Sequence, residues 1–287
     1  MDNNSAESIA KLASLEKYLI ANPRTVIVDP INRVREVVSR ARTCQHLSDV
    51  MSRLQEACPF TQPNYMVLPA DPSAIELHCA MRERDLAFPV ICKPVQACGT
   101  PHSHSMVIVT SAENIDMIKA PCVVQQYHDH ANALYKVYVI DRDVMVFRRQ
   151  SLPDLYCGHK DSSSLAGGAH VSSICSSSSS SSCCLTAGHC VRLRSVAFDS
   201  RRSYPTYQDF ICTECRTTAA AIRNEFGLTL FGFDAILPVQ HSISADLCGT
   251  GGAEVVVIDV NYFPSYKEVC DFPHRLKRFL ASRKAMS

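Results

Sequence analysis

The chain has 287 residues, of which 46% are hydrophobic, so it is long enough to bury one large or two modest cores. Its 29 basic and 28 acidic residues nearly cancel, which excludes a general nucleic-acid binder that relies on a positive surface. The first residues are polar with scattered apolar positions, unlike a secretory signal, and no apolar run is long enough to span a membrane. We therefore expect a soluble, cytoplasmic, monomeric protein.

The first third of the chain alternates between helical and strand patterns. Helical spacing of apolar residues, or a β-branched run, identifies each predicted element. The predicted elements are a helix over 6–21, a short strand in TVIVDP (25–30), helices in INRVREVVSRA (31–41) and LSDVMSRLQEA (47–57), and strands in FPVICKPV (88–95) and HSMVIVT (104–110).

The rest of the chain adds strands, a hairpin and two helices. In order, we expect a strand in PCVVQQY (121–127), a hairpin over 133–150 turning near Asp141, a helix over about 208–225 ending at Gly227, strands in LTLFGFDAILPV (228–239) and from Val255, and a closing helix over 273–284. Residues 157–205 are rich in serine and cysteine and show no periodicity, so we expect a largely disordered insertion there. The mixture favours an α+β, or mixed α/β, fold.

The 15 cysteines are odd in number and irregularly spaced. Most stand singly in apolar surroundings, where cysteine behaves as a small hydrophobic residue, so we expect reduced thiols and no disulfide framework. Cys212 and Cys215 have the spacing of half a zinc site, but the other pairs are irregularly placed. A closed zinc site needs four well-placed ligands, so we expect no zinc.

Acidic and amide side chains end two of the predicted core strands. The strand from Val255 places Asp259 and Asn261 two residues apart, and LFGFDAIL places Asp234 in a second apolar run. Residues i and i+2 of a strand share a face, so Asp259 and Asn261 project together. Oxygen ligands from two strands suit Mg²⁺, which leaves coordination positions for phosphate oxygens. For a single acid, capping a loop or pairing with arginine is the alternative.

Cations lie in or beside several apolar strands. Lys93 follows FPVIC, Lys136 lies inside ALYKVYVI, and Arg148-Arg149 end VMVF. An unpaired charge there is unfavourable, and phosphates would compensate it. Ordinary salt bridges at a sheet edge are the alternative. Together with the acids, these cations favour a nucleotide site. The chain lacks a P-loop, a protein-kinase signature and a G-x-G-x-x-G motif, which leaves nucleotide binding between two sheets.

Five ordered blocks then resemble a known family. They are FPVICKPVQACGTPHSHSM (88–106), PCVVQQYHDHANALYKVYVI (121–140), RRQSLPDL (148–155), LFGFDAI (230–236) and VIDVNYFPSY (257–266). Together they are similar to the inositol 1,3,4-trisphosphate 5/6-kinase (inositol-tetrakisphosphate 1-kinase) family, which has the ATP-grasp fold. The resemblance covers roughly residues 6–156 and 206–280. It implies two α+β subdomains that hold ATP between two antiparallel sheets.

The resemblance also implies a division of the chain and a set of nucleotide contacts. We expect a helical amino-terminal part (1–60), a central subdomain (61–135) and a carboxy-terminal subdomain (136–287) that carries the insertion. Lys93 would contact the ATP phosphates, and residues 125–136 would form the hinge beside adenine. The expected nucleotide-binding residues are Arg40, Lys93, Gln125, Gln126, Tyr127, Lys136, Ser151 and Ser172.

The remaining implied roles concern the metal and the substrate. Asp234, Asp259 and Asn261 would hold two Mg²⁺ ions. The expected substrate-binding residues are His104, Lys136, Arg149, Asn261 and Ser265, and the expected catalytic residues are Lys93, Lys136 and Asp259. The implied activity is ATP- and Mg²⁺-dependent phosphorylation of a ring hydroxyl of an inositol tris- or tetrakisphosphate. Inositol polyphosphate and ATP would be the partners, without nucleic acid.

Two departures from the family pattern leave other functions open. The chain starts without the βα lobe that usually precedes the helix at 6–21, for which we expect either a truncated gene model or weakened substrate binding. Ser265 replaces a usual glycine, where a side chain could crowd the ligand. These departures favour, as an alternative, a weakened module that binds nucleotide or inositol phosphate without turnover. An ATP-grasp carboxylate–amine ligase is a further alternative, which the histidine block at 103–106 argues against.

Overall fold

The computed structural model describes residues 6–97, 103, 105–131, 133–151, 191–193, 205–238 and 254–286. Apart from 191–193 and 205, the predicted disordered insertion (157–205) lies outside these residues. The helices are α1 (Ala6–Ala21), α2 (Ile31–Glu36), α3 (Arg40–Leu54), α4 (Ala74–Glu83), α5 (Pro205–Phe226) and α6 (Phe272–Met286), with 3₁₀ turns η1 (Gln55–Ala57) and η3 (Ala112–Met117).

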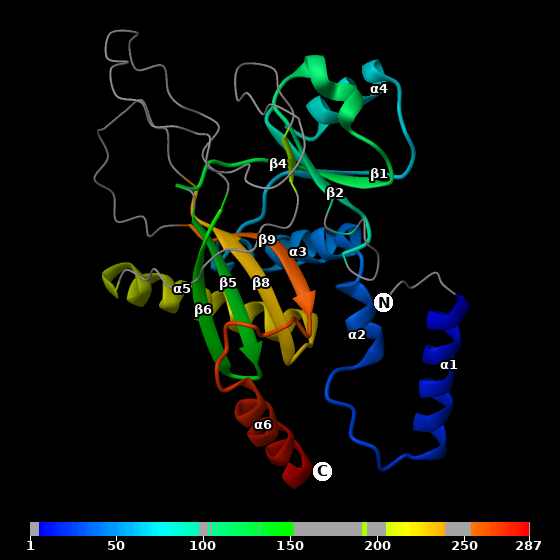
Figure 1. The fold of residues 1–287 in the computed structure, drawn as a ribbon, viewed down its shortest axis with the longest axis vertical. Helices are drawn as coiled ribbons and strands as arrows, with labels where there is room; N and C mark the ends of the chain where they lie inside the picture. Colours follow the sequence, from blue (N-terminus) through cyan, green and yellow to red (C-terminus); the bar gives the residue numbers. More distant parts are fainter. Residues whose placement is uncertain are drawn as a thin grey trace, which may run out of the picture.

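Two sheets with wholly antiparallel pairing form the framework of the molecule (Figure 1). The first has the order β1-β4-β2-β3-β7 and the second the order β6-β5-β8-β9. The strands are β1 (Tyr65–Leu68), β2 (Val90–Pro94), β3 (Met106–Val109), β4 (Cys122–Gln126), β5 (Ala133–Ile140), β6 (Asp143–Gln150), β7 (Val191–Leu193), β8 (Leu230–Ile236) and β9 (Val256–Tyr262). The α+β prediction is confirmed.

Each sheet buries one face against helices. In the second sheet, Val137 and Phe233 join a core with Leu47 of α3 and Ile222 of α5. In the first sheet, residues such as Met66 of β1 pack with Leu77 and Met81 of α4. Alternation of side chains along a strand leaves the opposite face of each sheet available for other contacts.

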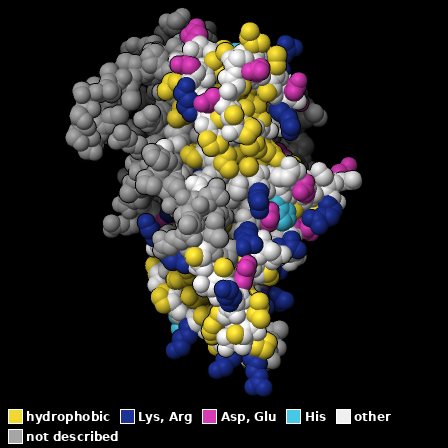
Figure 2. All heavy atoms as spheres, turned by 90° about the vertical axis from the view of Figure 1, so that its right-hand side faces the viewer, with side chains coloured by type: hydrophobic (Ala, Val, Ile, Leu, Met, Phe, Trp, Pro, Cys, Tyr) yellow, Lys and Arg dark blue, Asp and Glu magenta, His cyan; other side chains and the backbone are white. Residues whose placement is uncertain are grey.

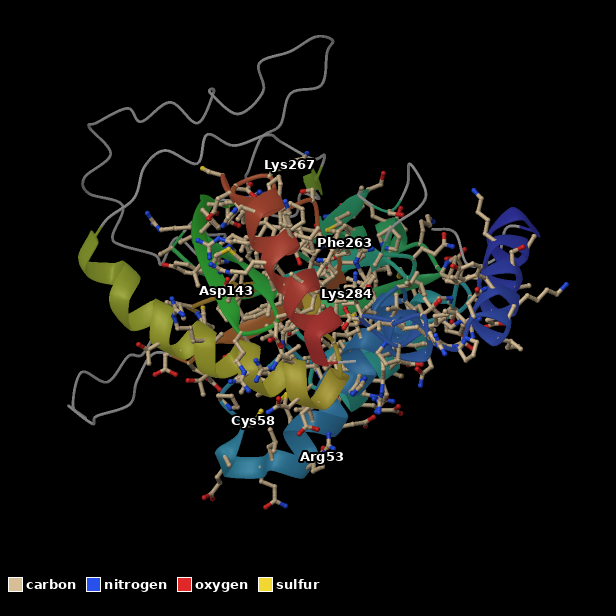
Figure 3. All side chains as sticks on the ribbon, turned by 90° about the horizontal axis from the view of Figure 1, so that it is seen from below. Arg53, Cys58, Asp143, Phe263, Lys267 and Lys284 are labelled. Carbon is tan, nitrogen blue, oxygen red and sulfur yellow. The ribbon has the colours of Figure 1, made fainter. Side chains whose placement is uncertain are left out.

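Helix α6 covers part of the opposite face of the second sheet. Phe279 of α6 packs in a cluster with Tyr138 of β5 and with Tyr266 from the turn before the helix. Nη2 of Arg278 lies 2.8 Å from the carboxylate of Asp143 in β6, and Figure 3 shows α6 running past Asp143. The upper part of this face, beyond α6, carries the polar residues described below.

Two sequence predictions about the amino-terminal region are wrong. Residues 25–30 form no strand, because Asp29 turns inward and accepts hydrogen bonds from the start of β8 while Val26 and Ile27 stay about half exposed. The helix predicted over 31–41 breaks after Glu36, because Ser39 pairs with Gln96 in an antiparallel bridge. A second helix, α3, then begins at Arg40 and runs to Leu54.

Most other predicted elements are confirmed within a few residues. The helix at 6–21, the hairpin turning at Asp141 and the strand at 230–236 match. The turn needs a left-handed residue, which Asp141 provides at φ 55°. Gly227 ends α5 at φ 63°, as a helix C-terminus favours.

The surface on the α1 side agrees with the near-zero net charge. Figure 2 shows side chains of both signs over this face, with apolar side chains gathered in its upper half and again toward its lower end, where the charged side chains are mostly basic. None of the helices in the described ranges is long and apolar enough to cross a membrane.

Candidate functional site

A row of charged residues crosses the second sheet. The register pairs Lys136 of β5 with Asp234 of β8, and Asp234 with Asp259 of β9. Directly opposed residues in antiparallel strands project from the same face, so the three side chains lie side by side. Nζ of Lys136 lies 3.3 Å from Oδ1 of Asp234.

A bulge in β9 shapes the end of this row. The register pairs Asp234 with Asp259 but Ala235 with Val257, so Ile258 has no cross-strand partner. Asn261 follows two residues after Asp259, and its Nδ2 donates to Oδ2 of Asp259 at 3.3 Å. The bulge therefore keeps Asp259 and Asn261 on one face while it turns the backbone at Ile258 away from the ladder.

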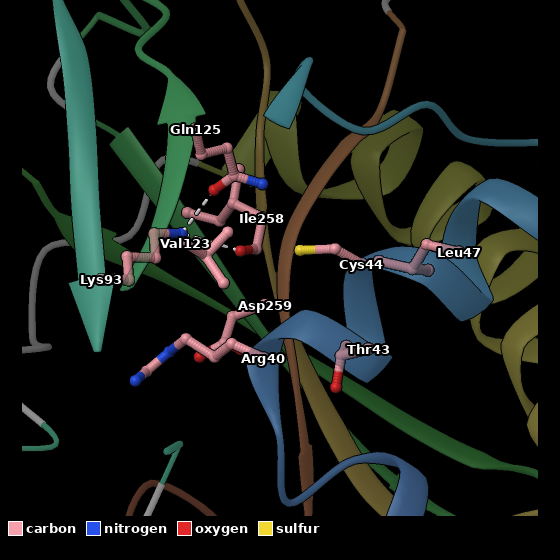
Figure 4. A pocket seen from close by; sticks show the side chains of 9 residues that line it. All are labelled: Arg40, Thr43, Cys44, Leu47, Lys93, Val123, Gln125, Ile258 and Asp259. Atoms are coloured by element: carbon pink, nitrogen blue, oxygen red, sulfur yellow. Dashed lines mark hydrogen bonds between the residues drawn. The ribbon is translucent and has the colours of Figure 1, made fainter. Parts of the chain in front are cut away.

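The freed carbonyl at Ile258 joins the two sheets through Lys93. Nζ of Lys93, in β2 of the first sheet, donates to the Ile258 carbonyl at 2.9 Å and to Oε1 of Gln125 at 2.6 Å (Figure 4). A lysine ammonium has three N–H donors, so one donor remains beyond these two bonds. Burial lowers the pKa of Lys93, and the nearby carboxylate of Asp259 opposes this effect.

Arg40 supplies a second buried cation beside Lys93. The start of α3 is fixed by its own backbone N–H, which donates to the Val95 carbonyl at 2.8 Å. The side-chain Nη1 donates to the carbonyls of Pro94 and Gln96 at 2.9 and 2.8 Å. Its Nε is buried and has no hydrogen-bond partner in the described part of the chain. The arrangement holds the guanidinium against the end of β2.

These residues line one pocket between the sheets (Figure 4). Its volume is about 10 Å³, roughly the space of one water molecule, so the pocket is much smaller than a site for a whole nucleotide. Burial raises the pKa of the Cys44 thiol in this pocket to about 11, which keeps it protonated and unreactive near neutral pH. The lining residues are Arg40, Thr43, Cys44, Leu47, Lys93, Val123, Gln125, Ile258 and Asp259.

The electrostatics of the row fit a hard cation. Burial raises the pKa of Asp234, Lys136 counteracts the shift, and the like charge of Asp259 adds to it. Two carboxylates and an amide oxygen are the donors that Mg²⁺ accepts, with phosphate and water completing its shell. Within the described residues no three His, Cys, Asp or Glu side chains form a metal cluster, so the set depends on Asn261 and on ligands from outside the protein.

A turn after β9 brings one more carboxylate to this face. Glu268 forms ion pairs with Arg149 of β6 and accepts a hydrogen bond from the hydroxyl of Tyr138. Arg149 lies two residues beyond Phe147, the partner of Lys136, and so shares the face of the row. Its charge also lowers the pKa of Asp234, although less than the nearer Lys136 does.

A comparison with protein families identifies the domain that carries these residues. A profile of the inositol 1,3,4-trisphosphate 5/6-kinase ATP-grasp domain matches residues 54–282, which is most of the chain. The chain belongs to this family. The match includes both sheets up to β9 and all of the charged row.

Relatives of this kinase family align over nearly the whole chain. An inositol-tetrakisphosphate 1-kinase from Xenopus laevis is 31% identical over 94% of this chain, and one from Danio rerio is 30% identical over 94%. One from Arabidopsis thaliana is 25% identical over 93%. The chain spans 61% of the length of the two animal relatives and 75% of the plant one.

Solved structures with little sequence similarity confirm the ATP-grasp fold. A RimK domain protein from Sphaerobacter thermophilus has a TM-score of 0.50 at 12% identity and covers 95% of this chain and 76% of its own. The D-alanine–D-alanine ligase of Helicobacter pylori also has a TM-score of 0.50 at 12% identity, covering 94% and 67%. At this identity the likeness concerns the fold alone.

The first three residues of the hinge predicted in this chain, Gln125, Gln126 and Tyr127, have different surroundings. Gln125 is buried and accepts from Lys93, whereas the side chain of Gln126 accepts from the backbone of Ala87 at 2.9 Å. Tyr127 is buried beside the ring of His130. Gln126 therefore fixes the loop before β2, a structural task that the sequence did not indicate.

Two further predicted site residues, Ser151 and Ser265, do not line the pocket. Ser151 lies at the end of β6, and its Oγ is 2.7 Å from Nε2 of His130. Ser265 is exposed, just after Pro264, which packs so closely on Gly232 that an added Cβ there would lie 2.9 Å from its ring. His104 and Ser172 lie outside the described residues.

Sequence reasoning missed three contributors to the site: Cys44, the Ile258 carbonyl and Glu268. Cys44 resembled any buried cysteine, and a backbone carbonyl carries no side-chain signal. Glu268 lies in a turn, where no periodicity indicates the direction of a side chain. Its spacing of seven residues from Asn261 has no meaning without the fold.

Proposed function

We propose that this chain is an ATP- and Mg²⁺-dependent inositol phosphate kinase, which transfers the terminal phosphoryl group of ATP to a ring hydroxyl of an inositol tris- or tetrakisphosphate. The observation that carries the proposal is the row Lys136–Asp234–Asp259, which faces Lys93 from the other sheet in a chain of this kinase family. The related proteins named inositol-tetrakisphosphate 1-kinase support the substrate class.

In this proposal, the cations at the sheet interface bind the nucleotide. Lys93 directs its remaining N–H to a phosphate oxygen, and Arg40 adds positive charge from the start of α3. The hinge formed by Gln125, Gln126 and Tyr127 lies beside the base, and Ser151 lies at the nucleotide edge. Phosphoryl transfer depends mainly on positioning and charge neutralisation, which this arrangement of cations supplies.

The proposed metal ligands are Asp234, Asp259 and Asn261. When bound there, two Mg²⁺ ions would neutralise charge that develops on the transferring phosphoryl group. The protein supplies two partly buried carboxylates held in register, together with Lys136, which limits their mutual repulsion in the absence of metal. Asn261, by donating to Asp259, fixes the orientation of that carboxylate.

The proposed substrate contacts are Lys136, Arg149, Asn261, Ser265 and His104. Lys136 and Arg149 share the face of the row, so a polyanionic ring held between them would lie next to the phosphoryl group. Lys136 would contact both nucleotide and substrate. Phosphorylation of an uncharged hydroxyl in this setting requires that the ring be oriented by its existing phosphates.

Transfer of labelled phosphate tests the function. The chain is incubated with γ-labelled ATP and a panel of inositol tris- and tetrakisphosphates, with and without Mg²⁺. We expect a labelled, more highly phosphorylated inositol that depends on Mg²⁺, and a fall of at least about 100-fold for Asp259→Ala, because a charged ligand in the transition state is lost.

Two other outcomes of this assay would favour the alternative functions. Binding of Mg·ATP without transfer to any inositol phosphate would leave the binding module without turnover as the function. ADP release that requires an amine together with a carboxylate would favour the ligase.

A further inference from the structure

Glu268 forms an ion pair with Arg149, the arginine that is proposed to bind a phosphate of the substrate. Its carboxylate pairs with Arg149 through one oxygen and accepts from the Tyr138 hydroxyl through the other. The side chains of Arg149 and Glu268 are only 26% and 12% exposed, so the pair is poorly screened by water. Arg149 therefore meets a ligand with its charge already neutralised by the protein.

The carboxylate is held firmly in this position. Tyr138 is fully buried, and burial raises the pKa of its hydroxyl, which stays a hydrogen-bond donor at neutral pH. Tyr266, two residues before Glu268, donates from its hydroxyl to the Val139 carbonyl at 2.9 Å and packs on Tyr138 with 5.2 Å between ring centroids. The turn is thus anchored to β5 at both positions.

The charge on this face is unfavourable for a polyanion. Lys136 and Arg149 provide two positive charges, and Asp234, Asp259 and Glu268 oppose them with three carboxylates. The proposed metal would compensate Asp234 and Asp259 but not Glu268, which lies at the Arg149 end. A phosphate that approaches Arg149 must displace this carboxylate or share the guanidinium with it.

We propose that Glu268 is a specificity-determining residue that competes with a ring phosphate of the substrate for Arg149. It weakens binding of inositol phosphates that place a phosphate at Arg149 and so favours substrates with a hydroxyl there. Glu268 acts through Arg149 and contacts no reacting atom, which makes it a positioning residue. This inference rests on the function proposed above.

The variant Glu268→Gln tests the competition in the intact chain. Glutamine keeps an oxygen that can accept from Tyr138 but removes the charge, so the turn should stay folded. By calorimetry, the dissociation constant for inositol tetrakisphosphate should fall about tenfold, the size expected for one freed charge-assisted contact. In the transfer assay, KM for the inositol phosphate should fall similarly, with KM for ATP within twofold of the wild type.

Two controls separate direct competition from a change in total charge or in folding. Asp271→Asn removes an equally negative group nearby, but that carboxylate pairs with Arg275 at 2.8 Å, so the affinity should not change. Adding Glu268→Gln to Arg149→Gln should give no gain, because the contested cation is gone. Thermal unfolding of each variant checks that the fold is retained.

The outcomes distinguish this inference from the proposed function. If wild type and Glu268→Gln bind inositol tetrakisphosphate equally, or if Asp271→Asn gives the same gain, Glu268 does not compete for Arg149 and the kinase proposal stands. If neither protein binds any inositol phosphate while both bind Mg·ATP, the proposed substrate class is wrong and this inference falls with it.

Discussion

Lys93 combines two functions that are usually separate. Its ammonium is buried, which is unfavourable for a cation, yet it joins β2 to the bulge in β9 through the Ile258 carbonyl. Burial lowers its pKa, so the protonated form is destabilised in the folded state. A buried cation with a shifted pKa supports the ligand-binding role proposed for Lys93, in addition to its contact between the sheets.

Replacement of this lysine should therefore separate binding from stability. In Lys93→Met, the affinity for Mg·ATP should fall about 10- to 100-fold, because a charged hydrogen bond to phosphate is lost. The urea midpoint at pH 7 should change little, because removal of the buried charge offsets the loss of the hydrogen bonds to Gln125 and the Ile258 carbonyl. Calorimetry and urea unfolding measure the two effects. The exposed Lys119→Met is the control, in which both properties should match the wild type.

The stability of the wild type relative to Lys93→Met should depend on pH in one direction. The folded pKa of Lys93 lies below its unfolded value, so between the two the unfolded chain binds a proton that the folded chain does not. The buried charge of Lys93 destabilises the folded chain at pH values below the folded pKa. This destabilisation disappears as the pH rises from the folded pKa to the unfolded pKa of Lys93. Wild type should therefore gain stability relative to Lys93→Met between pH 7 and 10. A constant difference in urea midpoint would mean that the lysine is not buried as a cation.

At the scale of elements, the side chain of Asp29 ties the connection between α1 and α2 to the second sheet by hydrogen bonds. Asp29 is 4% exposed and accepts from the Thr229 backbone at 2.6 Å, the Thr229 hydroxyl at 2.7 Å and the Leu230 backbone at 3.0 Å. These donors lie where β8 begins. The contact fixes the strand that carries Asp234 at its other end.

Loss of this fastening should destabilise the domain. Asp29→Ala leaves two buried backbone N–H groups without an acceptor, which should lower the free energy of unfolding by about 2–4 kcal/mol. Asp49→Ala is the control. It removes an exposed carboxylate that accepts one hydrogen bond, from Gln45 at 2.8 Å, and should change the free energy of unfolding by less than about 0.5 kcal/mol. Equal losses in the two variants, measured by urea unfolding, would show that Asp29 does not fasten the sheet.

The strands and their acids followed from the sequence because strand period is a local property. Asp259 and Asn261 share a face as the i, i+2 spacing predicts. The bulge at Ile258 depends on which strand pairs with β9, and its contact with Lys93 joins positions 165 residues apart. The strand predicted at 25–30 was wrong for a similar reason. The contact between Thr229 and Asp29 joins distant parts of the chain, so a local sequence pattern cannot indicate it.

At the scale of the whole molecule, Lys93 of the first sheet and Arg40 of α3 lie opposite the carboxylates of the second sheet, which also carries Lys136 and Arg149. Lys93 and Arg40 gather at the end of β2, and Asp234 and Asp259 lie in register on the second sheet. An ATP-grasp chain of this family thus holds complementary charges across the interface between its sheets (Figure 4). The account depends on the carboxylates binding divalent cations that a nucleotide shares.

Paramagnetic resonance of bound Mn²⁺, used in place of Mg²⁺, tests this claim most directly. With a non-hydrolysable ATP analogue, the wild type should bind about two Mn²⁺ ions per chain, close enough for spin coupling. Asp234→Asn and Asp259→Asn should each lose at least one ion, whereas Asp143→Asn, at the α6 ion pair, should keep both. Undiminished Mn²⁺ binding when Asp234 and Asp259 are both replaced would contradict the account.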